Sequence, residues 1–465
     1  MNRRELLFST GVAFGMSGLG AITGAAISAS ARQPQQTLLT IQSAEFKLRN
    51  AVTSGLVSLS PNAPPPVVFS QQHEPVVFDV ENTTQDSTAM HWHGIRLENS
   101  MDGVPYLTQM PIGEGQTFRY RFTPPDAGTY WYHPHCMTMK QMAHGLTGVL
   151  VVKEPSDPGF DVDQVINLRD FRLDNNDRLL PPYSIKKAAR GGTLGNVMTA
   201  NWQSNPVYEH PAGGLVRLRV VNTDTTRIYR LALEGARNKI VAWDGHPVVT
   251  ALPSPTLKQP LILGPGQRAD IAVLMPPHEG VTVKLLALKG SDNVEMTTLK
   301  AVGADLKRNF AQLKPLAQNP VSIPDLAAAE THEFVFGWSP SGNAPNDGFC
   351  GSLGKTFWSI NRIPWPGDAA KSKGPLASLE MRKSYIFRFR NESPNLHPIH
   401  LHGLTFMPLR SNKRKIAQNW TDTALLLKGE IMEVALVADN LGDWAFHCHV
   451  IEHQKTGLSG VIRVG

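Results

Sequence analysis

The chain of 465 residues has few cysteines and a low share of charged residues. Only three cysteines occur, Cys136, Cys350 and Cys448, so at most one intrachain pair can form and a disulfide framework is excluded. Charged residues make up 18% of the chain, which disfavours a disordered chain or a charged coiled coil. The formal net charge is +6, and the sequence has no long basic run that would follow a phosphate backbone. We therefore expect no nucleic-acid partner.

Long apolar runs are also scarce, with one exception at the N-terminus. Residues 6–31 carry no charge, follow two adjacent arginines and end on the small triplet ASA. We interpret residues 1–31 as a cleavable export signal that resembles the twin-arginine type. An uncleaved membrane anchor is the alternative. After removal of the signal we expect no membrane partner and a location in the periplasm or outside the cell.

Glycine and proline, by contrast, are frequent, with 39 and 35 residues. This composition suits many short strands better than long helices. Valine- and aromatic-rich runs alternate with turn residues, as in QTFRYRFTPP and LVRLRVVNT. The pattern predicts an all-β protein whose antiparallel strands form Greek-key sandwiches.

Three similar strand ends indicate an internal repeat. The segments FDVENTT, LRVVNT and FRFRNE each run through apolar residues and stop at an asparagine, namely Asn82, Asn222 or Asn391. Their separation is typical of domains rather than of solenoid repeats. We therefore predict three domains preceded by the signal. They span residues 32–155, 156–305 and 331–465, with a linker at 306–330.

Histidine spacing gives the strongest functional indication. The 16 histidines of the chain would by chance form about half of one His-x-His pair, yet four pairs occur. Because side chains alternate along a strand, both imidazoles of a pair project to the same face. Four such pairs favour metal binding over surface or core histidines. The pairs are His91/His93, His133/His135, His400/His402 and His447/His449.

A cysteine lies inside the last of these pairs. Cys448 separates His447 from His449, so its thiolate would project to the opposite face of the strand. Together with His397 and His453 it forms a His, Cys, His set, which is typical of blue-copper electron-transfer sites. The soft thiolate favours copper over harder metals. One strand would then contact two metal sites.

The motifs HWHG, HPH, HPIHLHG and HCHVIEH, in this order, resemble the four copper-binding motifs of the multicopper oxidases of laccase type. The segment LGPGQRAD at 263–270 resembles a middle-domain signature of that family. The resemblance implies three cupredoxin-like Greek-key β-sandwich or barrel domains and four copper ions. Its type 1 ligands would be His397, Cys448 and His453, and its type 2 ligands His91 and His400. Its binuclear type 3 ligands would be His93, His133, His135, His402, His447 and His449.

The resemblance also implies an oxidoreductase that uses O₂. A small reducing substrate, a phenol or an aromatic amine, would lose single electrons at the type 1 copper. Cys448 would pass them to His447 and His449, and four electrons would reduce O₂ to water at the trinuclear cluster. The alternatives are a Cu(I) or metal oxidase that serves copper tolerance and, from another class, a copper carrier. We expect a monomer.

Three positions near the motifs affect this chemistry. Leu458 occupies the axial position that holds a weak methionine ligand in many blue-copper sites, and its inability to coordinate should raise the reduction potential. Asp102 matches the acidic residue that the family places near the type 2 copper, and we expect it to supply protons. A turn residue is the alternative role for Asp102. Gln454 stands where the resembling bacterial enzymes often carry a proton-relaying glutamate, so the sequence does not decide whether a proton route passes through this position.

Two further features of the sequence, the soft side chains after His135 and the two cysteines outside the copper motifs, each allow two interpretations. The soft side chains that follow His135 either form a Cu(I) site or pack beneath the copper ligands. Cys136 and Cys350 either form a disulfide in an oxidising compartment or stay unpaired. The soft residues in question are Cys136, Met137, Met139, Met142 and His144.

Overall fold

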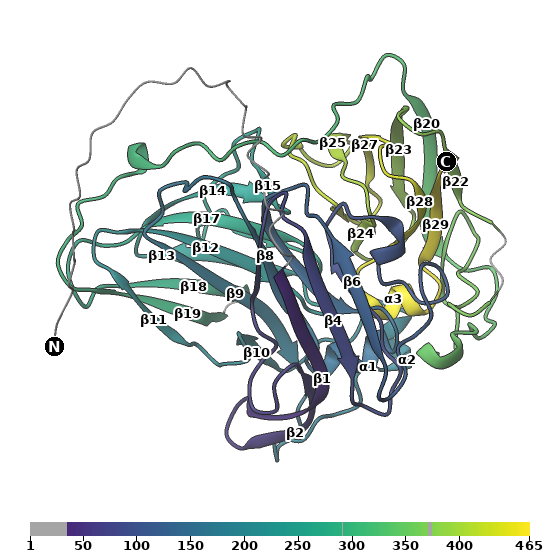
Figure 1. The fold of residues 1–465 in the computed structure, drawn as a ribbon, viewed down its shortest axis with the longest axis horizontal. Helices are drawn as coiled ribbons and strands as arrows, with labels where there is room; N and C mark the ends of the chain where they lie inside the picture. Colours follow the sequence, from purple (N-terminus) through teal and green to yellow (C-terminus); the bar gives the residue numbers. More distant parts are fainter. Residues whose placement is uncertain (1–34, 291, 371–373) are drawn as a thin grey trace, which may run out of the picture. The chain divides into compact units, whose positions relative to one another are not determined.

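A computed structural model describes residues 35–290, 292–370 and 374–465. The predicted export signal, residues 1–31, lies outside the described residues. The described residues form six β-sheets with a few short helices between strands (Figure 1), which confirms the predicted all-β class. No helix in this part of the chain is both long and apolar enough to cross a bilayer.

Residues 35–153 form two sheets of four strands. The first has the order β2-β1-β4-β6 and the second the order β3-β8-β7-β5. The strands are β1 (Gln35–Lys47), β2 (Val52–Ser58), β3 (Val68–Gln71), β4 (Val76–Asn82), β5 (Met90–His93), β6 (Thr117–Phe122), β7 (Gly128–Pro134) and β8 (Gly148–Lys153). The helices here are η1 (Asn99–Met101) and α1 (Thr138–Ala143).

Residues 162–302 form a six-stranded and a five-stranded sheet. Their orders are β10-β9-β12-β17-β14-β15 and β11-β19-β18-β13-β16. The strands are β9 (Val162–Phe171), β10 (Val197–Ala200), β11 (Val207–Pro211), β12 (Leu215–Asn222), β13 (Tyr229–Glu234), β14 (Arg237–Trp243), β15 (His246–Pro247), β16 (Leu261–Leu263), β17 (Arg268–Leu274), β18 (Thr282–Lys289) and β19 (Asp292–Val302). Helix α2 (Ile185–Ala188) lies between β9 and β10, and η2 (Phe310–Gln312) follows β19.

Residues 330–464 form two sheets of five strands. Their orders are β21-β20-β23-β27-β25 and β22-β29-β28-β24-β26. The strands are β20 (Glu330–Trp338), β21 (Trp358–Ile360), β22 (Ala377–Leu379), β23 (Ser384–Asn391), β24 (His397–Leu401), β25 (Met407–Ser411), β26 (Thr423–Leu426), β27 (Ile431–Val437), β28 (Gly442–Cys448) and β29 (Ser459–Val464). The helices are η3 (Gly348–Cys350) and α3 (Ile451–Lys455).

The same chain path occurs in all three regions. In each region the second strand pairs with the first, the third strand joins the other sheet, and the fourth strand returns beside the first. The fourth strands are β4, β12 and β23, and they end at Asn82, Asn222 and Asn391. Each of these asparagines donates from Nδ2 to two backbone carbonyl oxygens, one of them four or five residues later and the other 30 to 41 residues later. The repeat seen in the sequence is therefore a repeat of structure.

Most strand pairs are antiparallel, as expected, but one pair in each sheet is parallel. The fourth strand of each region lies parallel to the first, because the third strand carries the chain through the opposite sheet before it returns. The third strand likewise lies parallel to the last strand of its region. Such parallel pairs join strands distant in the sequence, and strand patterning alone does not reveal them.

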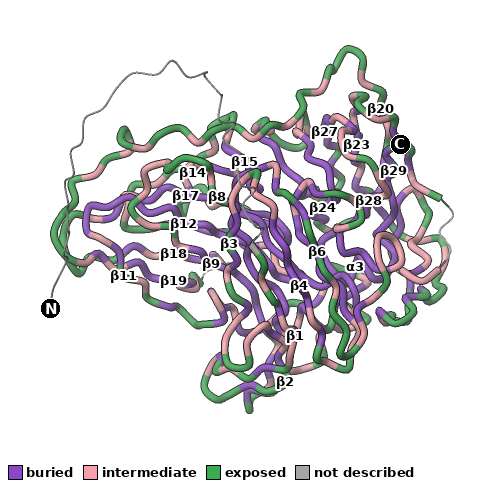
Figure 2. Tube along the Cα trace, viewed as in Figure 1, coloured by how far each residue is buried: buried purple, intermediate pink, exposed green. Residues whose placement is uncertain are grey.

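Each region buries an apolar core between its two sheets, and the buried positions run along the strands (Figure 2). A disulfide between Cys136 and Cys350 joins the first region to the third, which settles the alternative that the sequence leaves open. Cys136 comes two residues after the end of β7, and Cys350 ends η3. The covalent link therefore lies next to His135 in the sequence.

Candidate metal centre

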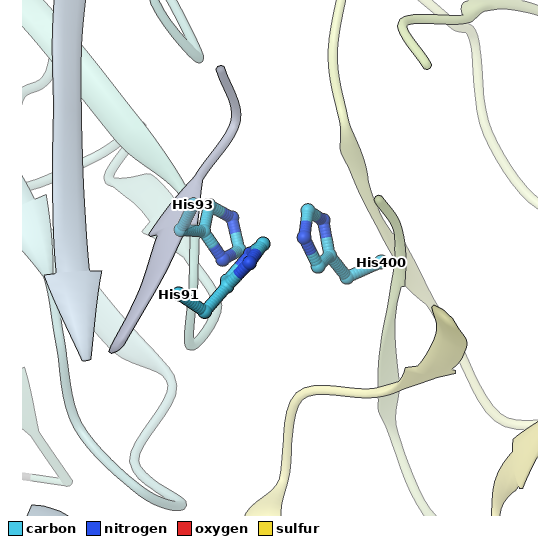
Figure 3. A group of neighbouring side chains, drawn as sticks. All are labelled: His91, His93 and His400. Carbon is cyan, nitrogen blue, oxygen red and sulfur yellow. The ribbon is translucent and has the colours of Figure 1, made fainter. Parts of the chain in front are cut away.

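The eight histidines of the His-x-His pairs come together between the first and third regions. His91 lies opposite His133 on β5 and β7, and His400 lies opposite His447 on β24 and β28. In Figure 3 the side chains of His91 and His93 extend from one strand toward that of His400, which extends from another. All eight side chains are buried. The strand period of two, which turns alternate side chains to one face, accounts for this convergence.

Three sets of these histidines have ring nitrogens that all lie within 4.8 Å of one another. The spacing suits ligands of a metal ion, and two sets share His93, so neighbouring sites would lie close together. The sets are His91/His93/His400, His93/His133/His449 and His135/His402/His447.

Six of the eight imidazoles have one ring nitrogen held by an oxygen atom. Nδ1 of His91 lies 2.8 Å from the carbonyl oxygen of Asp102, and Nδ1 of His400 lies 2.9 Å from that of Asp422. A neutral imidazole donates its single N–H to such an oxygen, so its other nitrogen carries the lone pair. The remaining contacts are His93 Nε2 with Asp422 Oδ1, His133 Nδ1 with the Pro134 carbonyl, His402 Nδ1 with Asp102 Oδ2, and His447 Nδ1 with the Cys448 carbonyl.

The other ring nitrogens of these six imidazoles are buried, and no N–H or O–H group of the described residues donates a hydrogen bond to them. Nε2 of His402 and Nε2 of His447 lie 3.0 Å apart, and both are lone-pair atoms in the tautomers given above. Buried polar atoms normally have partners, because an unpaired one retains its full desolvation cost. A bound cation would supply those partners, so the residues present fit a metal cluster. The unpartnered atoms include His91 Nε2, His93 Nδ1, His133 Nε2, His135 Nδ1, His400 Nε2, and both ring nitrogens of His449.

The second group contains Cys448, His397 and His453. Their ligand atoms form a triangle, with Sγ of Cys448 3.5 Å from His397 Nδ1 and 3.6 Å from His453 Nδ1, and with the two nitrogens 3.1 Å apart. The outer nitrogens are engaged elsewhere, because Nε2 of His397 is hydrogen-bonded with Ser393 Oγ at 2.7 Å and Nε2 of His453 donates to the Arg190 carbonyl at 2.6 Å. The triangle matches the trigonal set expected for blue copper.

Burial sets the protonation of both groups. It lowers the pKa of His447 to about 3 and that of His453 to about 4, so these imidazoles are neutral at physiological pH. Neutral imidazole is the form that binds metals. Burial raises the pKa of the Cys448 thiol, so a neighbouring cation is needed to hold the thiolate.

Asp102, which the resemblance places near the type 2 copper, lies beside the histidine cluster. It is buried, its Oδ2 lies 2.8 Å from Nδ1 of His402, and its carbonyl accepts from His91. Its Oδ1 lies 3.3 Å from Nδ1 of His91 and accepts no hydrogen bond from the described residues. One residue therefore orients imidazoles from both outer regions.

Asp422 is a site residue that sequence reasoning missed. Its carboxylate lies 3.0 Å from Nε2 of His93, its carbonyl accepts from His400, and Arg268 holds it from the opposite side. Burial alone would raise the pKa of Asp422, but the adjacent Arg268 guanidinium keeps it well below its usual range. The available signal was an acidic residue in an otherwise buried strand segment, TDTALL.

The middle region closes the cluster without contributing a histidine. Gly266, in the segment LGPGQRAD, has a φ of +89°, and a Cβ there would lie 3.0 Å from His93 and 3.1 Å from His449. Glycine is thus required both for the backbone conformation and for the close approach.

The remaining positions of interest lie near these groups. Leu458 is fully buried, and its carbonyl accepts from the backbone N–H of Cys448 at 3.0 Å. Gln454 Nε2 lies 3.2 Å from Nε2 of His135. Met139 and Met142 are buried in an apolar cluster, whereas Met137 and Met139 also line a cavity of about 290 Å³ with His144.

Two family models, both described as multicopper oxidase, match residues 40–157 and 350–465. The solved structure of a multi-copper oxidase from Pseudomonas thermotolerans is 37% identical, with a TM-score of 0.84, over 93% of this chain and all of that one. The multicopper oxidase MmcO of Mycobacterium tuberculosis is 29% identical over 95% of this chain and 90% of its own length. Laccase-1 of Cryptococcus neoformans is 25% identical over 86% of this chain and 76% of its own length. With the histidine cluster and the Cys448 triangle both in place, the chain belongs to the multicopper oxidase family.

Proposed function

We propose that the protein is a laccase-like oxidase. It couples four one-electron oxidations of a phenol or aromatic amine at a type 1 copper to the reduction of O₂ to water at a trinuclear copper cluster. The observation that carries this proposal is the strand β28, which ends at Cys448. This strand presents a thiol to one ligand triangle and the flanking imidazoles to the histidine cluster.

We propose the ligand roles that the resemblance to the family implies, and the sets described above are compatible with them. His397, Cys448 and His453 would hold the type 1 copper, and His91 and His400 the type 2 copper. Each copper of the binuclear type 3 pair would be held by one set of three histidines, and both sets combine histidines of the first and third regions. These sets are His93, His133 and His449, and His135, His402 and His447.

Copper bound at these sites would supply single-electron chemistry and the site of O₂ reduction. The chain supplies the surroundings. The buried imidazoles exclude bulk water, and Asp422 and Asp102 orient the rings. Oδ1 of Asp102, which accepts no hydrogen bond from the described residues, is available to hold a proton for the oxygen atoms being reduced. The proton route through residue 454 is weakened, because the Gln454 amide does not release a proton.

A second candidate is oxidation of Cu(I) in copper tolerance. It is favoured by the cavity that contains the thioethers of Met137 and Met139 and the imidazole of His144, which are soft or intermediate ligands. Steady-state kinetics with Cu(I) and with guaiacol, compared between wild type and Met137→Leu, separates the two. If Met137→Leu oxidises Cu(I) more slowly than wild type but oxidises guaiacol at the wild-type rate, the metal-oxidase role is favoured. If the variant matches wild type with both donors, the phenol role is favoured.

We propose three cupredoxin-like domains, one for each pair of sheets, and export to the periplasm or the exterior by the signal at 1–31. A monomer would suffice, because the first and third regions of one chain provide the whole ligand set.

The direct test is oxygen uptake by the copper-loaded protein with guaiacol as donor. The proposal expects four guaiacol molecules oxidised for each O₂ consumed, without accumulation of hydrogen peroxide. Stoichiometric copper binding without sustained oxygen uptake, with guaiacol or with Cu(I), would instead identify a copper carrier.

A further inference from the structure

The imidazoles of the Cys448 triangle are closed off from solvent. His397 and His453 are fully buried. The outer nitrogen of His453, which an incoming donor would approach, is occupied by the Arg190 carbonyl at 2.6 Å, in the segment that follows α2. A ring-sized donor therefore has no direct contact with either imidazole, and its electron needs another entry.

Trp358 provides a ring contact with both imidazoles. Its ring centroid lies 4.6 Å from that of His453 and 5.2 Å from that of His397. The indole is fully buried, and its Nε1–H donates to the Ala188 carbonyl at 2.9 Å. Trp358 is thus a fixed ring against the ligand triangle.

Trp338 continues this chain of rings to the surface. Trp338 and Trp358 are cross-strand partners at the ends of β20 and β21. Their rings are stacked, with centroids 4.3 Å apart and an interplanar angle of 15°. Trp338 is 48% exposed. Two stacked indoles therefore connect solvent with His453.

A surface cavity of about 260 Å³ lies beside Trp338. Its lining combines the indole and Pro340 with the polar groups of Ser359, Arg362 and Glu392. An aromatic ring can stack on an exposed indole, and a guanidinium and a carboxylate can orient a hydroxyl or amino substituent. At about 260 Å³ the cavity is slightly smaller than the roughly 300–1,000 Å³ of most ligand pockets, so it suits a donor with a single ring.

We propose that small phenols bind in this cavity against Trp338 and deliver their electrons to the Cys448 triangle through Trp338 and Trp358. The inference rests on the proposed function, which supplies the oxidant, type 1 Cu(II). Each phenol loses one electron to that copper, which becomes Cu(I), and releases its hydroxyl proton to bulk water, leaving a phenoxyl radical. The cavity and the indole pair select aromatic donors that fit the cavity, because the imidazoles themselves are shielded.

Binding is tested first on the copper-free protein, where the donor cannot be oxidised. Titration of guaiacol is followed by calorimetry for wild type, Trp338→Leu and Phe69→Leu. Phe69 is a matched control because it is 44% exposed on β3. We expect Trp338→Leu to weaken binding about fivefold or more, since an aromatic pair contributes on the order of 1 kcal/mol. Phe69→Leu should bind like wild type.

Electron delivery is tested on the copper-loaded proteins by anaerobic stopped flow. At subsaturating guaiacol, the second-order rate of bleaching of the blue band should fall in Trp338→Leu by at least the factor seen in binding. The position of the blue band before mixing should be unchanged, because Trp338 does not touch the ligands. If the leucine variant does not load copper, Trp338→Phe, which keeps a ring, replaces it in this test. Its rate of bleaching should lie between the rate of wild type and the rate expected for Trp338→Leu.

The outcomes separate this inference from the proposed function. Wild-type protein that binds guaiacol but never oxidises it would refute the proposed function and leave the binding site standing. Wild-type protein that oxidises guaiacol, with unchanged binding and bleaching in the Trp338 variants, would refute the inference alone.

Discussion

Arg268 donates two hydrogen bonds to the carboxylate of Asp422, at 2.9 and 2.7 Å, and both side chains are buried. Arg268 begins β17 of the middle region, whereas Asp422 immediately precedes β26 of the third. The carboxylate in turn orients His93, and the carbonyl of Asp422 orients His400. The middle region, which provides no histidine to the cluster, therefore controls the orientation of two of its imidazoles.

Replacing Asp422 by asparagine should weaken copper binding at the histidine cluster. Residues that orient metal-binding histidines typically change metal affinity by about 10- to 100-fold. Copper titration with EPR detection of the type 2 signal measures this, and the blue band should persist because Asp422 has no contact with Cys448.

The matched control is Asp270→Asn. Asp270 is also buried and paired with arginines, Arg217 and Arg219, but it touches no histidine. Both substitutions should lower the free energy of unfolding, by about 3–5 kcal/mol for a broken buried ion pair. Equal copper affinity in the two variants would show that Asp422 acts only on stability.

The difference between Asp422 and the histidines explains how far sequence reasoning reached. The His-x-His pairs were predictable because strand geometry acts within three residues. Asp422 was not, because its role depends on Arg268, which lies 154 residues earlier. The indole pair of Trp338 and Trp358 escaped notice for the same reason, since only the pairing of β20 with β21 brings the rings together.

Replacing Cys448 by serine should abolish the blue absorption and the oxidation of donors. A hydroxyl cannot provide the soft thiolate that the two imidazoles require as a third ligand. Copper content should fall from four ions to three per chain, with the type 2 EPR signal retained. A variant that keeps both its colour and its activity would remove Cys448 from the site.

Replacing Leu458 by methionine should lower the reduction potential of the type 1 site. A weak thioether ligand stabilises Cu(II) relative to Cu(I), whereas an apolar side chain at the axial position favours Cu(I). A tenfold change in the preference between oxidation states corresponds to about 59 mV, and we expect a shift on this order in a redox titration of the blue band. Leu436→Met, in the same apolar core, should leave the potential unchanged. An unchanged or higher potential in Leu458→Met would contradict the axial assignment.

Replacing Asp102 by asparagine should slow the reduction of O₂ more than the oxidation of the donor. The amide keeps the contact with His402 but cannot hold a transferable proton, and loss of a general acid costs about 100-fold or more. Stopped-flow reoxidation of the reduced protein measures the first rate, and anaerobic bleaching the second. Asp443→Asn, which removes an exposed charge paired with Arg463, is the control. Reoxidation at the wild-type rate would exclude Asp102 from the proton path.

The most direct measurement is copper quantitation on the purified protein, combined with optical and EPR spectra of the same sample. Four copper ions per chain, an intense blue band, one type 1 and one type 2 EPR signal, and two EPR-silent ions are the expected result. A fully loaded protein that lacks the blue band, or that binds one copper ion only, would contradict the assignment of a type 1 site joined by Cys448 to a trinuclear cluster.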